Sequence, residues 1–211
     1  MKKQFYRRNL PHWQPEDSVF FMTVRLQGSL PREVILRIQQ EHELQRKHLK
    51  KQGLSKKELA EELRKSHDLY FGKFDDLLDS GGTGPHWLKE DKIAQIWVDA
   101  LNYFDGDRYK VICSTVMSNH VHFIFYKLNQ ALLKVMQSLK SYTANEMNKA
   151  LQRSGGFWQH ESFDRVIRDR IELEYRINYV LDNPVKVGIV SHWSEYKHNY
   201  IHPDFKKYVE T

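Results

Sequence analysis

The spacing of apolar residues changes along the chain, and each change marks the boundary of an expected element. Short β-branched and aromatic runs at 18–26, 109–116 and 121–126 predict three strands. Apolar residues at helical spacing predict five helices, at 34–49, 55–77, 89–104, 131–153 and 170–181. The last helix is expected to close before Asn183-Pro184, because a residue preceding proline is pushed out of the helical region. The mixed segment 157–168 predicts a short strand or a loop.

This order of elements predicts an α+β protein with helices stacked on an antiparallel sheet. The helices in about 31–80 form an inserted pair between the first strand and the first helix that packs on the sheet. Ser55, followed three residues later by Glu58, predicts a capping box at the start of the second helix of the pair. We therefore expect a single domain over residues 1–190, and a C-terminal tail of unknown role at 191–211.

Composition places the chain among folded proteins without disulfides. Of 211 residues, 40% are hydrophobic and 13% aromatic, which is enough for a core and excludes a disordered chain. The single cysteine, Cys113, lies in an apolar run and is expected to be a buried, inert thiol. The basic N-terminal stretch lacks an apolar segment behind it, and no stretch of about 18 apolar residues occurs. A soluble, cytoplasmic protein without a membrane partner is expected.

The net charge of +6 is distributed unevenly. Residues 105–160 hold seven basic and three acidic groups, whereas 31–80 hold eleven and ten, the mixed pattern of solvated helix faces. The basic excess is compatible with binding nucleic acid, but proteins with other partners share it. Charge alone therefore does not identify a partner.

His120-Val121-His122 begins one of the expected strands. Residues two apart in a strand point to the same face, so both imidazoles are expected to project together while Val121 turns into the core. Two imidazoles placed in this way can hold one divalent cation. The alternative is two ordinary surface histidines in a chain that has eleven.

The helix expected after this strand carries Tyr142 and Glu146 four residues apart, on one helix face. Glu146 could complete a His-His-carboxylate site with open positions for substrate oxygens, and Mg²⁺ or Mn²⁺ would suit a phosphate substrate. Alternatively, Tyr142 packs half-buried on the sheet and Glu146 is a solvated charge paired with a neighbouring lysine.

Four motifs occur in order after the predicted helical pair, namely MSNHVHFIF, LKSYTANEMNK, GGFWQHESFDRVIRD and YVLDNPVKVGIV. Together they resemble the REP-associated tyrosine transposases, a branch of the single-tyrosine HUH transposases of the IS200-like group. The resemblance covers roughly residues 18–30 and 85–190. It implies a ferredoxin-like antiparallel sheet with helices packed on it, whose central strand presents the two histidines beneath the tyrosine helix.

The resemblance also implies roles for individual residues. Tyr142 matches the nucleophile, His120 and His122 match the metal pair, and Glu146 stands where related enzymes place a third ligand. The implied activity is cleavage and rejoining of single-stranded or hairpin REP-type DNA through a 5′-phosphotyrosine, assisted by Mg²⁺ or Mn²⁺. A monomer is expected rather than a dimer.

Five further residues are expected to contact DNA by this resemblance, since they lie in or beside its motifs: Asn119, Lys140, Trp158, Arg165 and Arg168. For Trp158 and Arg165 the alternatives are a core position and an ion pair. Two other functions stay open for the whole chain. One is a zinc hydrolase that uses water, and the other is a non-cleaving DNA-binding protein derived from a transposase.

Overall fold

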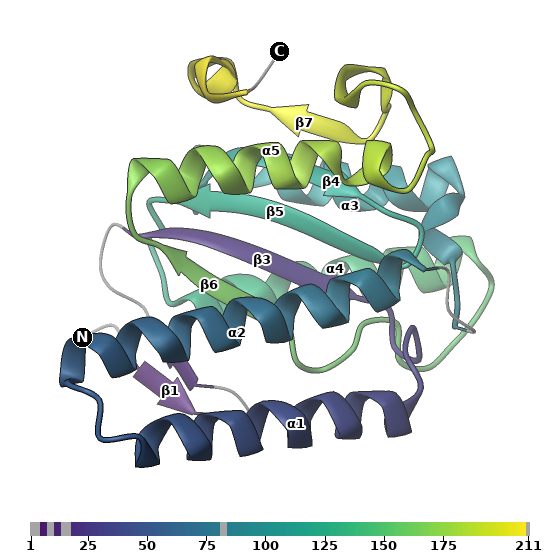
Figure 1. Ribbon diagram of the computed structural model, residues 1–211. Coiled ribbons are helices and arrows are strands. Elements are labelled where there is room, and N and C mark those ends of the chain that lie inside the picture. Colours follow the sequence, from purple (N-terminus) through teal and green to yellow (C-terminus); the bar gives the residue numbers. More distant parts are fainter. Residues whose placement is uncertain (1–4, 8–10, 14–17, 81–83, 210–211) are drawn as a thin grey trace. The chain divides into compact units, whose positions relative to one another are not determined.

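The computed structural model describes residues 5–7, 11–13, 18–80 and 84–209, so most of the basic N-terminal stretch lies outside it. Contacts divide the chain into two compact units. We call residues 28–85 the helical unit, and residues 1–27 together with 86–211 the sheet unit (Figure 1). Each unit is described by itself.

The sheet unit is built on five antiparallel strands in the order β6-β3-β5-β4-β7. These strands are β3 (Val19–Arg25), β4 (Lys110–Val116), β5 (His120–Tyr126), β6 (Phe163–Ile167) and β7 (Asn199–Ile201). The helices are α3 (Asp91–Tyr103), α4 (Leu132–Ala150) and α5 (Arg170–Lys186), with short 3₁₀ turns at Trp87–Lys89, Trp193–Glu195 and Pro203–Tyr208. Two short strands, β1 (Phe5–Arg7) and β2 (Pro11–Trp13), pair separately.

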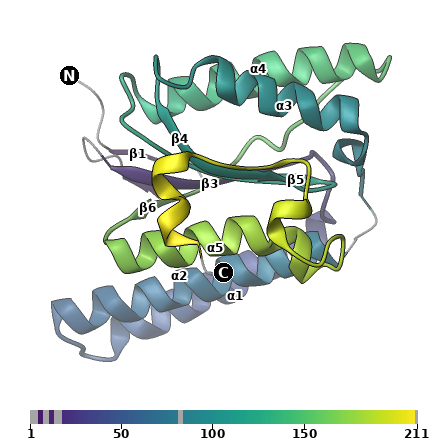
Figure 2. The same ribbon diagram turned by 90° about the horizontal axis from the view of Figure 1, so that it is seen from above.

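The order β3-α3-β4-β5-α4-β6 with spatial order β6-β3-β5-β4 is the ferredoxin-like arrangement. The expected α+β fold is therefore confirmed. As Figure 2 shows, α3 and α4 cover one face of the sheet and α5 covers the other. The two faces consequently receive different side chains from each strand.

Strand parity assigns the residues of β5 to these faces. Val121, Phe123 and Phe125 belong to the main apolar cluster with residues of α3 and α4. Within that cluster Trp97 packs edge-on against Phe123, with ring centroids 5.5 Å apart. His120, His122 and Ile124 therefore face the α5 side of the sheet.

Helix α5 is longer than expected, because it continues through Asn183 and Pro184 to Lys186. Pro184 lies in the last turn of the helix, where its missing N–H costs only one helical hydrogen bond. The residues that follow it already form the hydrogen bonds that are typical of a helix C-terminus. The N–H of Ile189 bonds to the Pro184 carbonyl, and that of Val187 to Asn183. The prediction that the helix closes before Asn183 is wrong, and Asn183 lies on the helix.

The helical unit contains α1 (Arg32–Lys51) and α2 (Lys56–Asp79). The predicted capping box is confirmed, since the N–H of Glu58 donates to Ser55 Oγ and the N–H of Ser55 donates to the Glu58 carboxylate. Between the two helices, the His42 ring stacks on the Tyr70 ring with centroids 4.2 Å apart. Burial, aided by nearby Arg46, lowers the pKa of His42 to about 4.

Cys113 is fully buried, as expected, and burial raises the pKa of its thiol well above the ordinary value. Among the described residues, no helix is both long enough and apolar enough to cross a bilayer.

Candidate functional site

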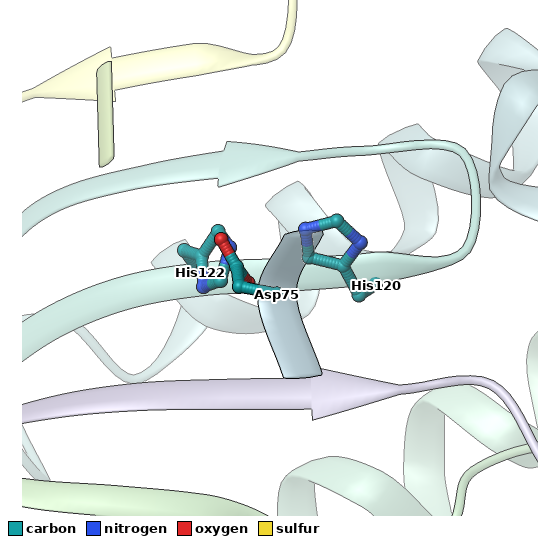
Figure 3. Close-up of side chains that lie close together, drawn as sticks. All are labelled: Asp75, His120 and His122. Atoms are coloured by element: carbon teal, nitrogen blue, oxygen red, sulfur yellow. The ribbon is translucent and has the colours of Figure 1, made fainter. Parts of the chain in front are cut away.

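The central strand β5 presents His120 and His122 side by side. Their ring centroids lie 4.6 Å apart, both side chains are buried, and Figure 3 shows both rising from the same strand. Val121 between them belongs to the apolar cluster on the opposite face. The predicted same-face placement of the imidazoles is thus confirmed. Asp75, also drawn in Figure 3, belongs to the helical unit.

Hydrogen bonds to Nδ1 orient both imidazoles. The Asn119 side-chain oxygen lies 2.7 Å from His120 Nδ1, and the Thr23 hydroxyl lies 2.8 Å from His122 Nδ1. A carbonyl oxygen only accepts, so Nδ1 of His120 donates and its Nε2 carries the lone pair. The Thr23 hydroxyl can play the same accepting role for His122. In metal sites, a hydrogen bond at Nδ1 of this kind fixes the orientation of the ring and leaves Nε2 as the nitrogen that can bind the metal.

Helix α5 places Tyr179 beside the histidines, on the same face of the sheet. The Tyr179 ring lies 5.7 Å from the His122 ring and 6.0 Å from Phe21, centroid to centroid. Phe21 in turn stacks on His122 at 5.6 Å. Three aromatic rings from β3, β5 and α5 therefore hold one another in position.

A cation lies in the same cluster. Arg176 is only 5% exposed, and its guanidinium carbon lies 5.2 Å from the Phe21 ring centroid and 5.8 Å from that of Tyr179. The helix α5 therefore adds a positive charge beside the Phe21 and Tyr179 rings, two of the three aromatic rings of this cluster.

Asn183 is the next residue of α5 on this side, four positions after Tyr179. Helix α5 runs antiparallel to β5 (Figure 1), so going from Tyr179 to Asn183 along the helix runs in the same direction as going from His122 to His120 along the strand. The rise along each element is about 6 Å. Asn183 is 1% exposed, and neither its Oδ1 nor its Nδ2 has a hydrogen-bond partner in the described part of the chain. An unsatisfied buried amide is costly unless something binds it.

These donors fit a divalent cation. Two imidazole nitrogens and an amide oxygen form a mixed set that leaves positions for substrate oxygens. The orphaned amide of Asn183 is the structural observation that favours a bound group on this side of the sheet.

The structure does not bring Tyr142 and Glu146 to the histidines. Both lie on α4, which covers the opposite face of the sheet (Figure 2). Tyr142 is 57% exposed, and Glu146 pairs with Lys149 at 2.6 Å. The two residues do share a helix face, as predicted, and line a shallow cavity between α3 and α4. In a ferredoxin-like unit both crossover helices pack on one face, and His120 and His122 point to the other.

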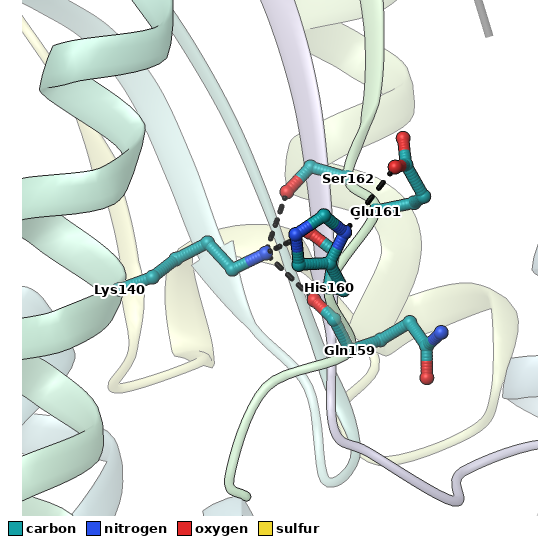
Figure 4. Close-up of polar contacts among 5 residues, drawn as sticks. All are labelled: Lys140, Gln159, His160, Glu161 and Ser162. Carbon is teal, nitrogen blue, oxygen red and sulfur yellow. Dashed lines mark hydrogen bonds and ion pairs between the residues drawn. The ribbon is translucent and has the colours of Figure 1, made fainter. Parts of the chain in front are cut away.

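Four of the five expected DNA contacts have partners for their side chains within the protein, and Asn119 and Lys140 are two of them. Asn119 is buried against His120. The Lys140 ammonium donates to the carbonyls of Gln159 and His160, at 2.6 and 2.9 Å, and to the Ser162 hydroxyl at 3.1 Å (Figure 4). Lys140 therefore ties α4 to the segment that leads into β6.

The other three expected contacts differ in exposure. Trp158 is buried in the apolar cluster and donates its indole N–H to Thr143. Arg165 forms an ion pair with Glu172 in which both side chains are largely buried. The Arg168 side chain is exposed. Of the five, Arg168 is therefore the one whose placement leaves it open to a ligand.

Tyr179 and Asn183 are the residues that sequence reasoning missed. Both lie in the YVLDNPVKVGIV motif, where the four-residue spacing of a tyrosine and an amide is visible. The topology is the signal that could have found them. In the expected ferredoxin-like order, the helix that follows the second histidine packs on the face of the sheet opposite to the two imidazoles.

Three comparisons relate this chain to known proteins. The family described as "Transposase IS200 like" matches residues 90–183. A Haemophilus influenzae protein described as "Putative REP-associated tyrosine transposase" is 25% identical over 137 residues, which are 56% of this chain and 77% of that protein. A solved structure described as a REP-associated tyrosine transposase bound to a REP hairpin aligns with 98% of this chain and 87% of its own, at 16% identity and a TM-score of 0.49. Residues 90–183 thus carry the signature of the IS200-like transposase family, and the resemblance drawn from the four motifs is confirmed.

Proposed function

We propose that this protein is a DNA transposase that cleaves and rejoins single-stranded DNA through a covalent bond to Tyr179. The observation that carries the proposal is the Tyr179 ring 5.7 Å from His122, on the face of the sheet to which both histidines point. Tyr179 replaces Tyr142 in the role that the motifs imply.

The Tyr179 oxygen attacks a backbone phosphorus as the phenol gives up its proton. The P–O3′ bond breaks, the 3′ oxygen takes up a proton, and the 5′ phosphate stays joined to the tyrosine. Attack by a 3′-OH on this phosphotyrosine restores a phosphodiester and frees the phenol. No water nucleophile or ATP is needed, because the covalent bond conserves the energy of the broken one.

In this proposal His120, His122 and Asn183 hold a divalent cation, Mg²⁺ or Mn²⁺, through two Nε2 atoms and one amide oxygen. When bound, the cation polarises the scissile phosphate and offsets its charge. Asn119 and Thr23 keep the imidazoles in the ligating orientation. Arg176 lies where it can neutralise a phosphate oxygen beside Tyr179.

The proposed substrate is single-stranded or hairpin DNA of the REP type, the kind of DNA named for the solved relative. Arg168 is proposed as a backbone contact. Because the tyrosine and the histidines come from one chain, a monomer contains the whole site, and we propose a cytoplasmic monomer.

The test is a denaturing gel of the protein with an end-labelled hairpin from the repeats beside its own gene. The expected result is a labelled protein band that needs Mg²⁺ or Mn²⁺, disappears with chelator and is absent in Tyr179→Phe. Tyr142→Phe is the matched control, an equally conservative change on α4, and is expected to keep the band.

Loss of the band in Tyr142→Phe with retention in Tyr179→Phe would refute the assignment of the nucleophile. Binding without any adduct would favour the non-cleaving DNA-binding protein. Hydrolysis without an adduct and with Zn²⁺ alone would favour the zinc hydrolase.

A further inference from the structure

The charges of the helical unit are segregated along its two helices, although residues 31–80 as a whole are nearly balanced. Residues 46–57, which we call the basic tip, hold six of the eleven Lys and Arg side chains of 31–80 and none of its ten Asp and Glu side chains. The basic tip comprises the end of α1, the turn that follows and the start of α2 (Figure 1). A local excess of this size is typical of a surface that binds a polyanion.

A short turn brings the charged ends of the two helices together. Helix α1 ends at Lys51 and α2 begins at Lys56. Gly53 between them has a φ of 67°, in the left-handed region that glycine adopts without strain. The lysines at the end of α1 and at the start of α2 therefore lie at the same end of the helical pair.

Most of this charge is not neutralised within the protein. Four lysines of the basic tip are exposed and have no ion pair within the described part of the chain, namely Lys50, Lys51, Lys56 and Lys57. The neighbouring acidic side chains have other partners. The Glu43 carboxylate pairs with Lys47 at 3.1 Å, and the Glu58 carboxylate accepts from the N–H of Ser55 at 2.9 Å.

The placement of Lys56 and Lys57 does not serve the stability of α2. They are the first two residues of the helix, where the positive end of the helix dipole favours acidic side chains and disfavours cations. Lys50 and Lys51 lie in the last turn of α1, where the dipole favours cations. Two exposed cations placed against a helix dipole, without a partner in the described part of the chain, indicate an anionic ligand outside the chain.

A phosphate backbone fits this surface better than an unpaired base or a lipid surface. Residues 46–57 contain no Phe, Tyr or Trp on which a base could stack, and the ring of His48 bonds to the Gln52 amide at 2.9 Å. The two leucines of the basic tip, Leu49 and Leu54, are buried and half-buried, so they offer no apolar face to a membrane. Lysine ammonium groups bind phosphates as point charges.

We propose that the basic tip binds the phosphate backbone of the duplex stem of the hairpin. The inference rests on the proposed function, because the identity of the DNA comes from there. A backbone contact adds affinity and carries no sequence information. The helical unit thereby contributes to DNA binding without taking part in cleavage.

The experiment measures the Kd of a labelled hairpin by fluorescence anisotropy over a range of salt concentrations. Lys56→Gln with Lys57→Gln is expected to raise the Kd about 5-fold or more at ~0.1 M salt, and to lower the slope of log Kd against log salt by about 2, one for each phosphate contact. Lys65→Gln with Lys73→Gln is the matched control, with the same loss of charge from the same helix. Both of these lysines already have glutamate partners, so neither the Kd nor the slope should change.

Two further measurements separate a backbone contact from a structural effect. Urea unfolding of Lys56→Gln with Lys57→Gln is expected to show unchanged or increased stability, because cations are removed from the start of α2. Lys50→Gln with Lys51→Gln tests the same surface from α1 and is expected to weaken binding similarly. A hairpin with a scrambled stem sequence should show the same losses as the native hairpin.

Equal Kd values and equal salt slopes for the wild type and both variants of the basic tip would overturn the inference, and so would a loss confined to one stem sequence. Weaker pelleting of these variants with phosphatidylglycerol vesicles, at unchanged hairpin binding, would overturn it in favour of a lipid surface. Failure of the proposed function looks different, because then the wild type forms no adduct although the slope still depends on the basic tip. A wild type that does not bind the hairpin would overturn both.

Discussion

Thr23 and Thr115 flank His122 on the two neighbouring strands, and they provide a sharp test of how the proposed metal-binding histidines are oriented. Both threonines are register partners of His122, both are buried, and cross-strand partners point to one face. The Thr23 hydroxyl lies 2.8 Å from His122 Nδ1, whereas the Thr115 hydroxyl has no hydrogen-bond partner in the described part of the chain. We therefore expect Thr23→Val and Thr115→Val, which are nearly isosteric with the native residues, to have opposite effects.

In Thr23→Val, Nδ1 of His122 is left buried without its acceptor, which costs about 1–3 kcal/mol of unfolding free energy. Loss of an outer hydrogen bond to a ligating histidine typically weakens metal binding about 10–100-fold. In Thr115→Val, no hydrogen bond is lost and an unsatisfied hydroxyl is removed, so stability is expected to stay the same or rise.

The assays are Mn²⁺ titration by calorimetry and urea unfolding of the metal-free protein. A 10–100-fold loss of Mn²⁺ affinity in Thr23→Val alone supports the orientation described here. Equal Mn²⁺ affinities in both variants and the wild type would refute the idea that the Thr23 hydroxyl sets the ligating nitrogen.

Three further predictions concern stability. Acidification from pH 6.5 towards 4 is expected to destabilise the helical unit by about 2 kcal/mol. The reason is that His42 takes up a proton in the unfolded chain over this range, whereas in the folded unit its pKa is about 4. In His42→Phe, the midpoint of urea unfolding should therefore depend less on pH over this range. Trp97→Ala removes a fully buried indole and is expected to cost about 3–5 kcal/mol in urea unfolding, against little change for Tyr103→Ala at an exposed position of the same helix. Ser55→Ala breaks the capping box at α2 and should lower the unfolding free energy by about 1 kcal/mol, which Ser55→Asp should restore.

Local patterns predicted local structure well. The alternation in β5 placed His120 and His122 on one face, and the Ser55 capping box marked the start of α2 correctly. In each case the deciding interaction lies within a few residues of chain. The same holds for Cys113, whose apolar run was sufficient to predict its burial.

Local patterns could not show which tyrosine lies beside the histidines. Helical spacing shows that Tyr142 and Glu146 share a face, but it does not show which face of a sheet the helix covers. That depends on the crossover order of the whole unit, which sets α4 against Phe123 and leaves α5 to cover the histidines. The error at Pro184 has a similar origin, since packing of Val180 and Leu181 in the core outweighs a single lost hydrogen bond.

The position of β5 in the middle of the sheet has a consequence for the order in which the site is assembled. Both histidines pair with β3 on one side, and on the other side His122 pairs with β4 while the Met117 N–H donates to the His120 carbonyl. Their amide protons are therefore expected to exchange with solvent only on global unfolding. Tyr179 is held instead by the packing of α5 on the sheet, through its ring contacts with Phe21 and His122. The spacing of the two imidazoles is therefore fixed by the sheet alone, so in the proposed mechanism the metal-binding pair is preorganised before the tyrosine and the DNA are brought to it.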